Sequence, residues 1–247
     1  MQRKYSWRPD VPDHRDHLFS LQAGVYPKKV DRLGMGNRIE DQGQLGSCTG
    51  NSSTSAAEIV TKVPYQLSRL MAYYEGRKIE GTIKQDSGCE IRDVIKGIQT
   101  VGICNEDLYP YNISKFTKAP SAKAKKDAKK LLPLIKSYER LSTLDDVKTA
   151  LAAGLPVVFG FSVPEFFEGD DVAKHGFVRM PTRADKMIGG HAVVAVGYDD
   201  TAPTPFVWVR NSWGPDWGIQ GYFQMDQKWF TDPRRLVDDM WVMHPAT

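Results

Sequence analysis

The feature that most constrains this chain is a polar, glycine-rich turn that runs directly into a helix-forming segment. The turn, residues 41–50, carries Gly46 and Gly50 on either side of Cys48. After Gly50 neither glycine nor proline occurs before Pro64, and apolar residues recur at helical spacing in between. The pattern therefore predicts a buried helix that begins at or beside Cys48.

A cysteine at the start of a helix has a particular chemistry. The free N–H groups and the partial positive charge of a helix N-terminus favour an anion, so a thiol held there tends towards thiolate. Thiolate is the form that attacks a carbonyl carbon. Cys48 is therefore the candidate nucleophile, although a cysteine taken alone is more often a buried structural thiol.

Polar residues that suit a partnership with Cys48 occur far downstream. His191 and Asn211 each stand at the end of an apolar, strand-like run. His191 can act as base and acid, with Asn211 orienting its ring. Gln42, six residues before Cys48, can add its side-chain amide to the Cys48 N–H as a second donor to an oxyanion. Taken singly, His191 would be read as a core histidine and Asn211 as a turn former.

Three sequence blocks, in this order, resemble the signature blocks of papain-like cysteine peptidases. They are Gln42-Gly43-x-x-Gly46-Ser47-Cys48, then Gly190-His191-Ala192-Val193 with Gly197-Tyr198, then Asn211-Ser212-Trp213-Gly214-x-x-Trp217-Gly218. The resemblance covers about residues 28–247. The absence of a recognisable secretory signal or disulfide framework is similar to some bacterial and viral members of that family.

The resemblance implies a fold, an activity and a set of roles. The fold is α+β, with a helical lobe, an antiparallel β-barrel-like lobe and an active-site cleft between them. The activity is cysteine endopeptidase, which hydrolyses peptide bonds through a thiolate–imidazolium pair and a thioester, without metal or organic cofactor. The implied catalytic residues are Cys48, His191, Asn211 and Gln42, with Trp213 as a lid over the His191–Asn211 bond. An acyltransferase or transpeptidase and an inactive peptide-binding homologue stay open as alternatives.

The same resemblance implies a substrate-binding set, which comprises Gly88, Cys89, Met187, Gly190, Ala192 and Trp213. Gly88 and Cys89 lie in a loop whose main chain would bond an extended peptide. A pocket for the residue two before the cut would be lined by Met187, Ala192, Cys89 and a residue between 238 and 241. For Cys89 a buried thiol without a substrate role is the favoured alternative.

Periodicity divides the chain at about residue 134. Residues 28–134 should form the helical lobe, with helices at 69–78 and 90–101 after the one at Cys48. Residues 135–247 should form the β-rich lobe, after a short helix at 144–153 opened by Thr143 and Asp146. Strands are predicted at 157–163, 190–198, 206–211, 221–225 and 240–243.

Residues 1–27 should form an N-terminal extension or a short pro-segment. Their prolines and paired charges predict extended chain, with Tyr5, Trp7, Leu18 and Phe19 as anchors. Packing on the outer surface is favoured over a segment that contacts and blocks the cleft. No apolar core of a secretory signal follows the basic start.

Composition narrows the partners to polypeptide substrates. The formal charge is +3 and both signs are mixed along the chain, so nucleic-acid binding is not expected. No apolar run approaches the ~20 residues of a membrane anchor. Cys89 and Cys104 would lie ~20 Å apart along a helix, too far for a disulfide. A cytoplasmic or other reducing compartment is favoured, with export by an unrecognised route left open. The sequence does not indicate an oligomeric state.

Overall fold

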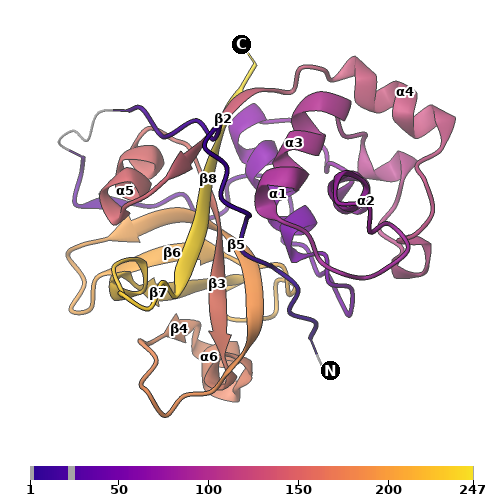
Figure 1. Ribbon diagram of the computed structural model, residues 1–247. Helices are drawn as coiled ribbons and strands as arrows, with labels where there is room; N and C mark the ends of the chain where they lie inside the picture. Colours follow the sequence, from indigo (N-terminus) through magenta and orange to yellow (C-terminus); the bar gives the residue numbers. More distant parts are fainter. Residues whose placement is uncertain (1–2, 22–25, 247) are drawn as a thin grey trace.

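Helices build the first lobe of the computed structural model, which describes residues 3–21 and 26–246 (Figure 1). Their bounds are α1 (Cys48–Thr61), α2 (Arg69–Ile79), α3 (Ile91–Val101) and α4 (Ala122–Lys130). Short 3-10 turns follow α3 at η1 (Glu106–Leu108) and η2 (Ile113–Lys115). The predicted helix start at Cys48 is confirmed, and the helices at 69–78 and 90–101 are confirmed to within one residue.

Local capping explains where several helices begin. The Ser68 hydroxyl accepts a hydrogen bond from the Met71 N–H and so opens α2. Thr143 and Asp146 form the predicted capping box at the start of α5 (Leu144–Ala152), each side chain accepting the other residue's N–H. The second lobe also holds α6 (Asp170–His175), η3 (Glu165–Glu168) and η4 (Gln227–Phe230).

The second lobe is organised around an eight-stranded sheet. Its path is β2-β8-β3-β5-β6-β7-β4, and β1 pairs with β5. All pairs are antiparallel except β4 with β7. The bounds are β1 (Lys29–Val30), β2 (Ile135–Leu141), β3 (Val157–Pro164), β4 (Phe177–Val178), β5 (Met187–Asp199), β6 (Phe206–Arg210), β7 (Tyr222–Asp226) and β8 (Val237–Pro245).

The sheet differs from the prediction in two respects. The α+β papain-like fold class is confirmed, but the sheet is not a closed barrel, because among the described residues its path ends at β2 on one side and β4 on the other. Short apolar strands between turns predict antiparallel pairing, but they do not fix the closure that a barrel needs. The prediction also missed β2, which pairs with β8. Its charged residues Lys136, Glu139 and Arg140 interrupt the apolar pattern by which the other strands were predicted.

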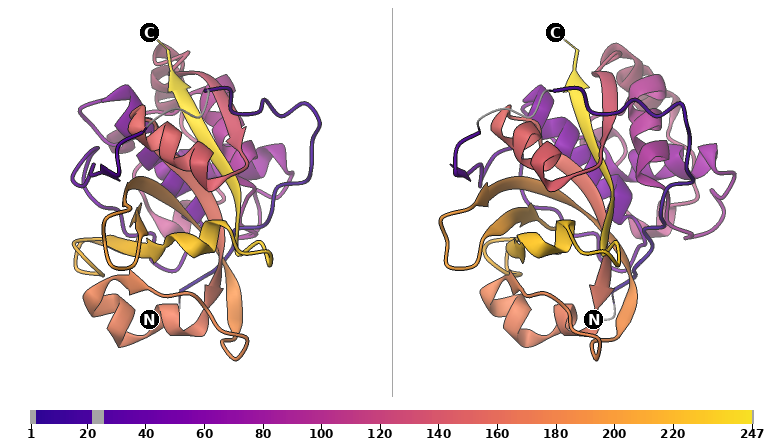
Figure 2. Two further views of the ribbon diagram at one scale, coloured as in Figure 1. Left: turned by 90° about the vertical axis from the view of Figure 1, so that its left-hand side faces the viewer. Right: turned by 60° about the vertical axis from the view of Figure 1, so that its left-hand side comes forward.

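Each face of the sheet is buried by a different set of elements (Figure 2). Val158, Val194 and Trp241 belong to a core shared with α1, α2 and α3. The alternate residues Phe159 and Val193 belong to a second core, shared with α5. Burial on both faces explains why these strands read as continuous apolar runs. The first core also fixes the start of α1 against β5.

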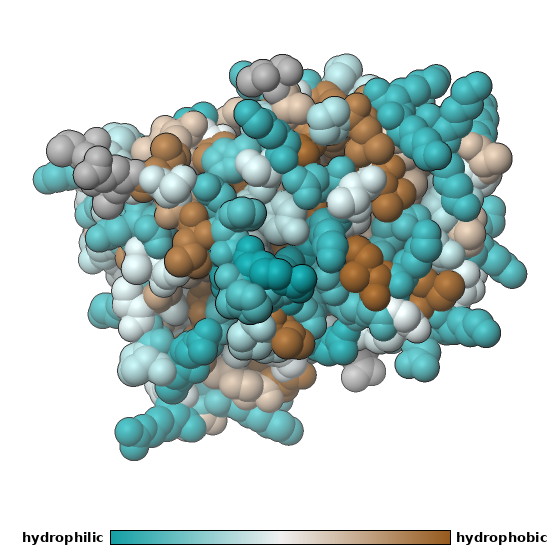
Figure 3. Space-filling view, turned by 45° about the horizontal axis from the view of Figure 1, so that its top comes forward, coloured by the Kyte–Doolittle hydropathy of each residue, from teal (hydrophilic) through white to brown (hydrophobic). Residues whose placement is uncertain are grey.

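The outer surface is predominantly polar. Hydrophilic side chains cover most of the face in Figure 3, with small apolar patches between them. Within residues 3–21 and 26–246, none of the helices combines the length and apolar character needed to cross a bilayer. Cys48, Cys89 and Cys104 are free thiols in the buried interior.

A buried arginine holds the loop between α2 and α3 that borders the lobe interface. The Arg77 guanidinium donates to the carbonyl oxygens of Ile83 (2.9 Å), Gln85 (3.0 Å) and Phe116 (2.6 Å). Its Nε donates to the Tyr73 carbonyl oxygen at 3.2 Å. Because the side chain is fully buried and its bonds to these carbonyl groups are partly buried, water can replace the lost donors only in part.

We therefore expect Arg77→Met to lower the free energy of unfolding by about 3 kcal/mol, since several buried carbonyl groups lose their donor. Urea denaturation measures the change. Lys96→Met is the matched control on the neighbouring helix α3, because that residue is exposed and its removal should cost less than about 0.5 kcal/mol. Equal effects of the two substitutions would contradict this role of Arg77.

Candidate active site

Cys48 is the first residue of α1 and lies where the first lobe meets β5. Its side chain is fully buried. Cys48 and Ala192, on β5, belong to the same buried core, and the main-chain N–H of Ala192 acts to lower the pKa of the thiol. Ala192 directly follows His191, so the structure brings the predicted nucleophile and the predicted base to the same point of the lobe interface.

His191 is held by the residues predicted to orient and cover it. Its Nε2 lies 2.8 Å from Asn211 Oδ1, and Trp213 stacks on the imidazole with ring centroids 5.2 Å apart and an interplanar angle of 28°. His191 Nδ1 is buried without a hydrogen-bond partner among the described residues. Since Nε2 faces Asn211, Nδ1 is the nitrogen left to exchange a proton with Cys48.

Gln42 is locked beside this group from the other lobe. Its Oε1 accepts from the Ser212 hydroxyl at 2.7 Å, and its Nε2 donates to the Leu45 carbonyl oxygen at 3.1 Å. Its main-chain N–H also donates to the Ser212 carbonyl oxygen at 2.9 Å. The fully buried amide therefore has a fixed orientation and one N–H not used by these bonds.

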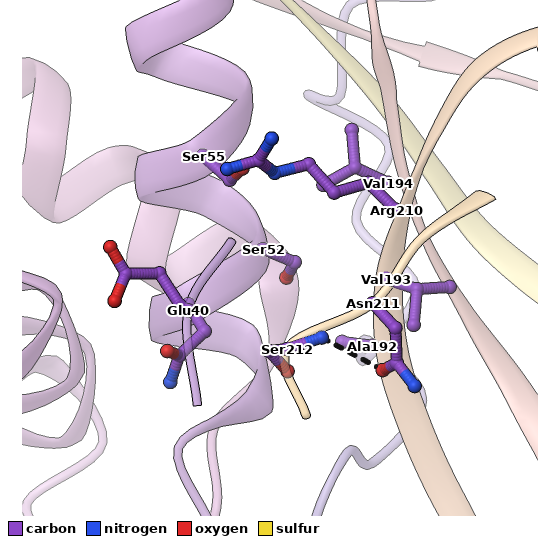
Figure 4. A pocket seen from close by; sticks show the side chains of 10 residues that line it. Glu40, Ser52, Ser55, Ala192, Val193, Val194, Arg210, Asn211 and Ser212 are labelled. Carbon is purple, nitrogen blue, oxygen red and sulfur yellow. Dashed lines mark hydrogen bonds between the residues drawn. The ribbon is translucent and has the colours of Figure 1, made fainter. Parts of the chain in front are cut away.

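A small polar cavity lies between α1 and the strands β5 and β6, beside Asn211 (Figure 4). It has a volume of about 10 Å³, and Ser52, Ser55, Arg210, Asn211 and Ser212 are among its walls. This is room for one water molecule with several polar neighbours. The Ser212 N–H donates to Asn211 Oδ1 at 2.8 Å, so the amide that orients His191 is itself fixed from this side.

The N-terminal segment runs between the two lobes (Figure 1), where it contacts Cys48 and His191. The Ser6 hydroxyl donates to the Gly46 carbonyl oxygen at 2.7 Å and lies 3.9 Å from the Cys48 sulfur. Tyr5 contacts the His191 ring edge-on at 6.3 Å between centroids. The prediction that this segment packs on the outer surface is therefore wrong for residues 3–8.

Glycines on the cleft walls make room for this segment. A Cβ at Gly160 of β3 would lie 1.9 Å from the Trp7 indole, and one at Gly190 would lie 2.6 Å from it. A Cβ at Gly88 would lie 1.8 Å from the Ser6 carbonyl oxygen. The main-chain N–H of Trp7 also donates to the Gly190 carbonyl oxygen at 3.1 Å. The need for glycine at these positions could not be predicted from the sequence, because it arises only where distant segments of the folded chain meet.

The segment is anchored further along by a buried acid. Asp10 accepts a hydrogen bond from Trp241 Nε1 at 2.7 Å, and its own N–H donates to Asp239 at 2.7 Å. Burial and the neighbouring charge of Asp239 raise the pKa of Asp10 to about 7. Among the predicted anchors Trp7 is buried, whereas Leu18 is 67% exposed and does not serve as one.

Burial under the segment favours the uncharged forms of the catalytic pair. It raises the pKa of the Cys48 thiol, against hydrogen bonds from Ala192 and Ser6 that lower it. It also lowers the pKa of His191 to about 4, a change that the Arg3 charge reinforces and the Asn211 hydrogen bond opposes. The thiolate expected at a helix N-terminus is thus disfavoured while the segment is in place.

The predicted substrate-binding residues lie at different depths. Gly88, Gly190 and Trp213 contact the segment directly, and Ala192 pairs with Gly160 on the adjacent strand. The Cys89 thiol is buried within the helical core, 3.8 Å from the Tyr73 carbonyl oxygen. Met187 is 36% exposed at the start of β5. Roles of Cys89 and Met187 in binding substrate stay predictions.

Comparisons with known proteins agree with this geometry. Residues 26–232 match the family described as papain family cysteine protease. The chain is 37% identical, over 99% of its length and 88% of the relative, to an uncharacterized peptidase C1-like protein of Acanthamoeba polyphaga mimivirus. It is 28% identical to bovine pro-cathepsin H, over 92% of this chain and 68% of that protein.

Among solved structures, xylellain, a cysteine protease from Xylella fastidiosa, superimposes with a TM-score of 0.91 at 35% identity, covering 98% of this chain and 96% of the other. Bromelain from Ananas comosus, in complex with the E64 inhibitor, matches with a TM-score of 0.69 at 18% identity, covering 89% of this chain and 100% of the other. The second likeness concerns the fold alone.

The chain belongs to the papain family of cysteine proteases. It is a thiol-dependent endopeptidase whose substrates are polypeptides, as the sequence blocks predicted. Neither the site nor the comparisons favour the alternatives of acyl transfer to an amine or of an inactive homologue.

Proposed function

We propose that Cys48, His191, Asn211 and Gln42 divide the peptidase chemistry among them. Cys48 thiolate attacks the peptide carbonyl carbon, and the Cys48 N–H and Gln42 Nε2 donate to the oxyanion that forms. His191 gives its proton to the leaving amine and then takes one from the water that hydrolyses the thioester. Asn211 holds the ring in place. The observation that carries this assignment is the 2.8 Å contact between His191 and Asn211, directly beside Ala192, which packs with Cys48 in one buried core.

Replacement of two residues tests these roles. Cys48→Ala should abolish peptide hydrolysis, and Gln42→Ala should lower kcat by about a hundredfold with little change in KM, because its hydrogen bond strengthens only as the oxyanion forms. Steady-state kinetics on a fluorogenic peptide measures both. Gln44→Ala is the matched control, since Gln44 is exposed in the same turn. Hydrolysis that survives Cys48→Ala would disprove the assignment.

We also propose that residues 3–8 inhibit the enzyme. Trp7 fills a pocket between Gly160 and Gly190, and Tyr5 covers His191. At the nucleophile the segment presents Ser6, whose hydroxyl oxygen lies 3.9 Å from the Cys48 sulfur and donates its proton to the Gly46 carbonyl oxygen. The Ser6 carbonyl oxygen lies instead against Gly88. The segment thus occupies the cleft in front of the thiol, where a substrate peptide would have to lie, and this accounts for inhibition.

Trp7→Ala tests the inhibitory role. Loss of the indole should weaken docking of the segment and raise kcat/KM on the order of tenfold, since a large buried side chain no longer fills the pocket. Alkylation of Cys48 by iodoacetamide, followed by peptide mass mapping, should accelerate in parallel. Leu18→Ala, at an exposed position of the same segment, serves as the control. Unchanged turnover together with unchanged alkylation in Trp7→Ala would remove the inhibitory proposal.

A further inference from the structure

The N-terminal segment pairs its positive charges with carboxylates along the cleft. Arg3 Nη1 lies 2.8 Å from Asp41 Oδ1, and Lys4 Nζ lies 2.7 Å from Asp86 Oδ2. Further along, Arg8 pairs with Glu80. None of these three acids belongs to the proposed catalytic group. A peptide that replaces the segment will therefore meet carboxylates that have lost their cations.

Asp86 differs from the other acids in its closeness to the nucleophile. Its Oδ1 accepts from the Gly46 N–H at 3.0 Å and from the Tyr73 hydroxyl at 2.7 Å. Gly46 stands two residues before Cys48, and its carbonyl oxygen accepts the Ser6 hydroxyl. The carboxylate is thus fixed by the enzyme's own donors, independently of Lys4, on the first-lobe side of the thiol.

Lys4 is the cation that completes this site while the segment is docked. In the part of the chain that the structure describes, no other lysine or arginine forms an ion pair with Asp86. The Asp86 side chain is only 12% exposed in the pair. When the segment leaves, two neutral donors remain around a largely buried negative charge, an arrangement that favours a new cation.

The opposite wall restricts where a substrate side chain can go. The substrate residue whose carbonyl carbon is attacked must lie against Cys48. His191, Trp213 and the β5 main chain occupy the second-lobe side of the thiol. The side chain of that substrate residue must therefore extend past Gly46, towards Asp86. The pocket that holds Trp7 lies elsewhere, between Gly160 and Gly190, and receives a different residue.

We propose that Asp86 is a specificity-determining residue that selects lysine or arginine immediately before the cut. This inference rests on the proposed roles of Cys48 and His191. It adds the class of substrate, a peptide with a cationic residue at the cleavage point, and it assigns Lys4 as the internal occupant of the same site. The Lys4–Asp86 pair in the structure shows that an ammonium group reaches this carboxylate beside the thiol.

A pair of matched peptides tests the proposal in the full-length enzyme. The two fluorogenic peptides share an aromatic residue two before the cut and differ only in arginine or citrulline immediately before it. Citrulline keeps the length and most of the hydrogen-bonding shape of arginine but carries no charge. Since the N-terminal segment competes with both peptides alike, the ratio of their kcat/KM values reports the charge alone.

The expected preference for arginine over citrulline is on the order of tenfold in the wild-type enzyme, the worth of one charge-assisted contact at a partly shielded site. Asp86→Asn should bring this ratio close to one, largely by slowing hydrolysis of the arginine peptide. The asparagine oxygen can still accept from Gly46 and Tyr73, so the loop keeps its bonds. Asp107→Asn, an exposed carboxylate of the same lobe, should leave the ratio unchanged.

Several results would overturn the proposal. Equal hydrolysis of both peptides by the wild-type enzyme, or a preference that persists in Asp86→Asn, would show that Asp86 does not select charge. If Asp86→Asn does not fold, the ratio of kcat/KM for the arginine and citrulline peptides can be measured on the wild-type enzyme at rising ionic strength. The ratio should fall as salt screens the ion pair, and a constant ratio would contradict the proposal. Failure of both the wild-type enzyme and the Trp7→Ala variant to cleave either peptide would count against the proposed catalytic roles, and with them this inference.

Discussion

The contact on which the rest of the structure depends is that between the first turn of α1 and the middle of β5. Here Cys48 and Ala192 pack in one buried core, and the two residues belong to different lobes. The contact is held by a core that α1, α2 and α3 share with one face of the sheet. Because the helix and the strand are rigid elements fixed by packing, the nucleophile and base keep a defined geometry. The cleft follows from the same arrangement.

The N-terminal segment changes the electrostatics of that contact. Its residues exclude water from the thiol and the imidazole, and Arg3 adds a positive charge near His191. Both effects oppose a thiolate–imidazolium pair, while the hydrogen bonds from Ala192 and Asn211 support it. Movement of the segment would therefore do more than open the cleft. It would also restore solvation to the charged forms on which catalysis depends.

Several elements that position the predicted catalytic residues could be predicted from sequence, because they arise from local patterns with a physical cause. The glycine-rich turn before Cys48 and the apolar spacing after it predicted the start of α1, and the Thr143–Asp146 pattern predicted the cap of α5. The position of the N-terminal segment could not be predicted in this way. It depends on the missing side chains of Gly160 and Gly190, which lie far along the chain and meet Trp7 only in the folded molecule. Closure of a sheet into a barrel likewise depends on tertiary packing, so the short apolar strands in the sequence did not show that this sheet stays open.

The most direct test of the account is to titrate the Cys48 thiolate by its ultraviolet absorbance with the segment displaced. In a Trp7→Ala background, coupling to His191 should give Cys48 an apparent pKa well below the ordinary thiol value of about 8.5, and adding His191→Gln should return it to about that value. If Cys48 titrates near the ordinary value both with and without His191, the sulfur and the imidazole do not act as a pair, and the account is contradicted.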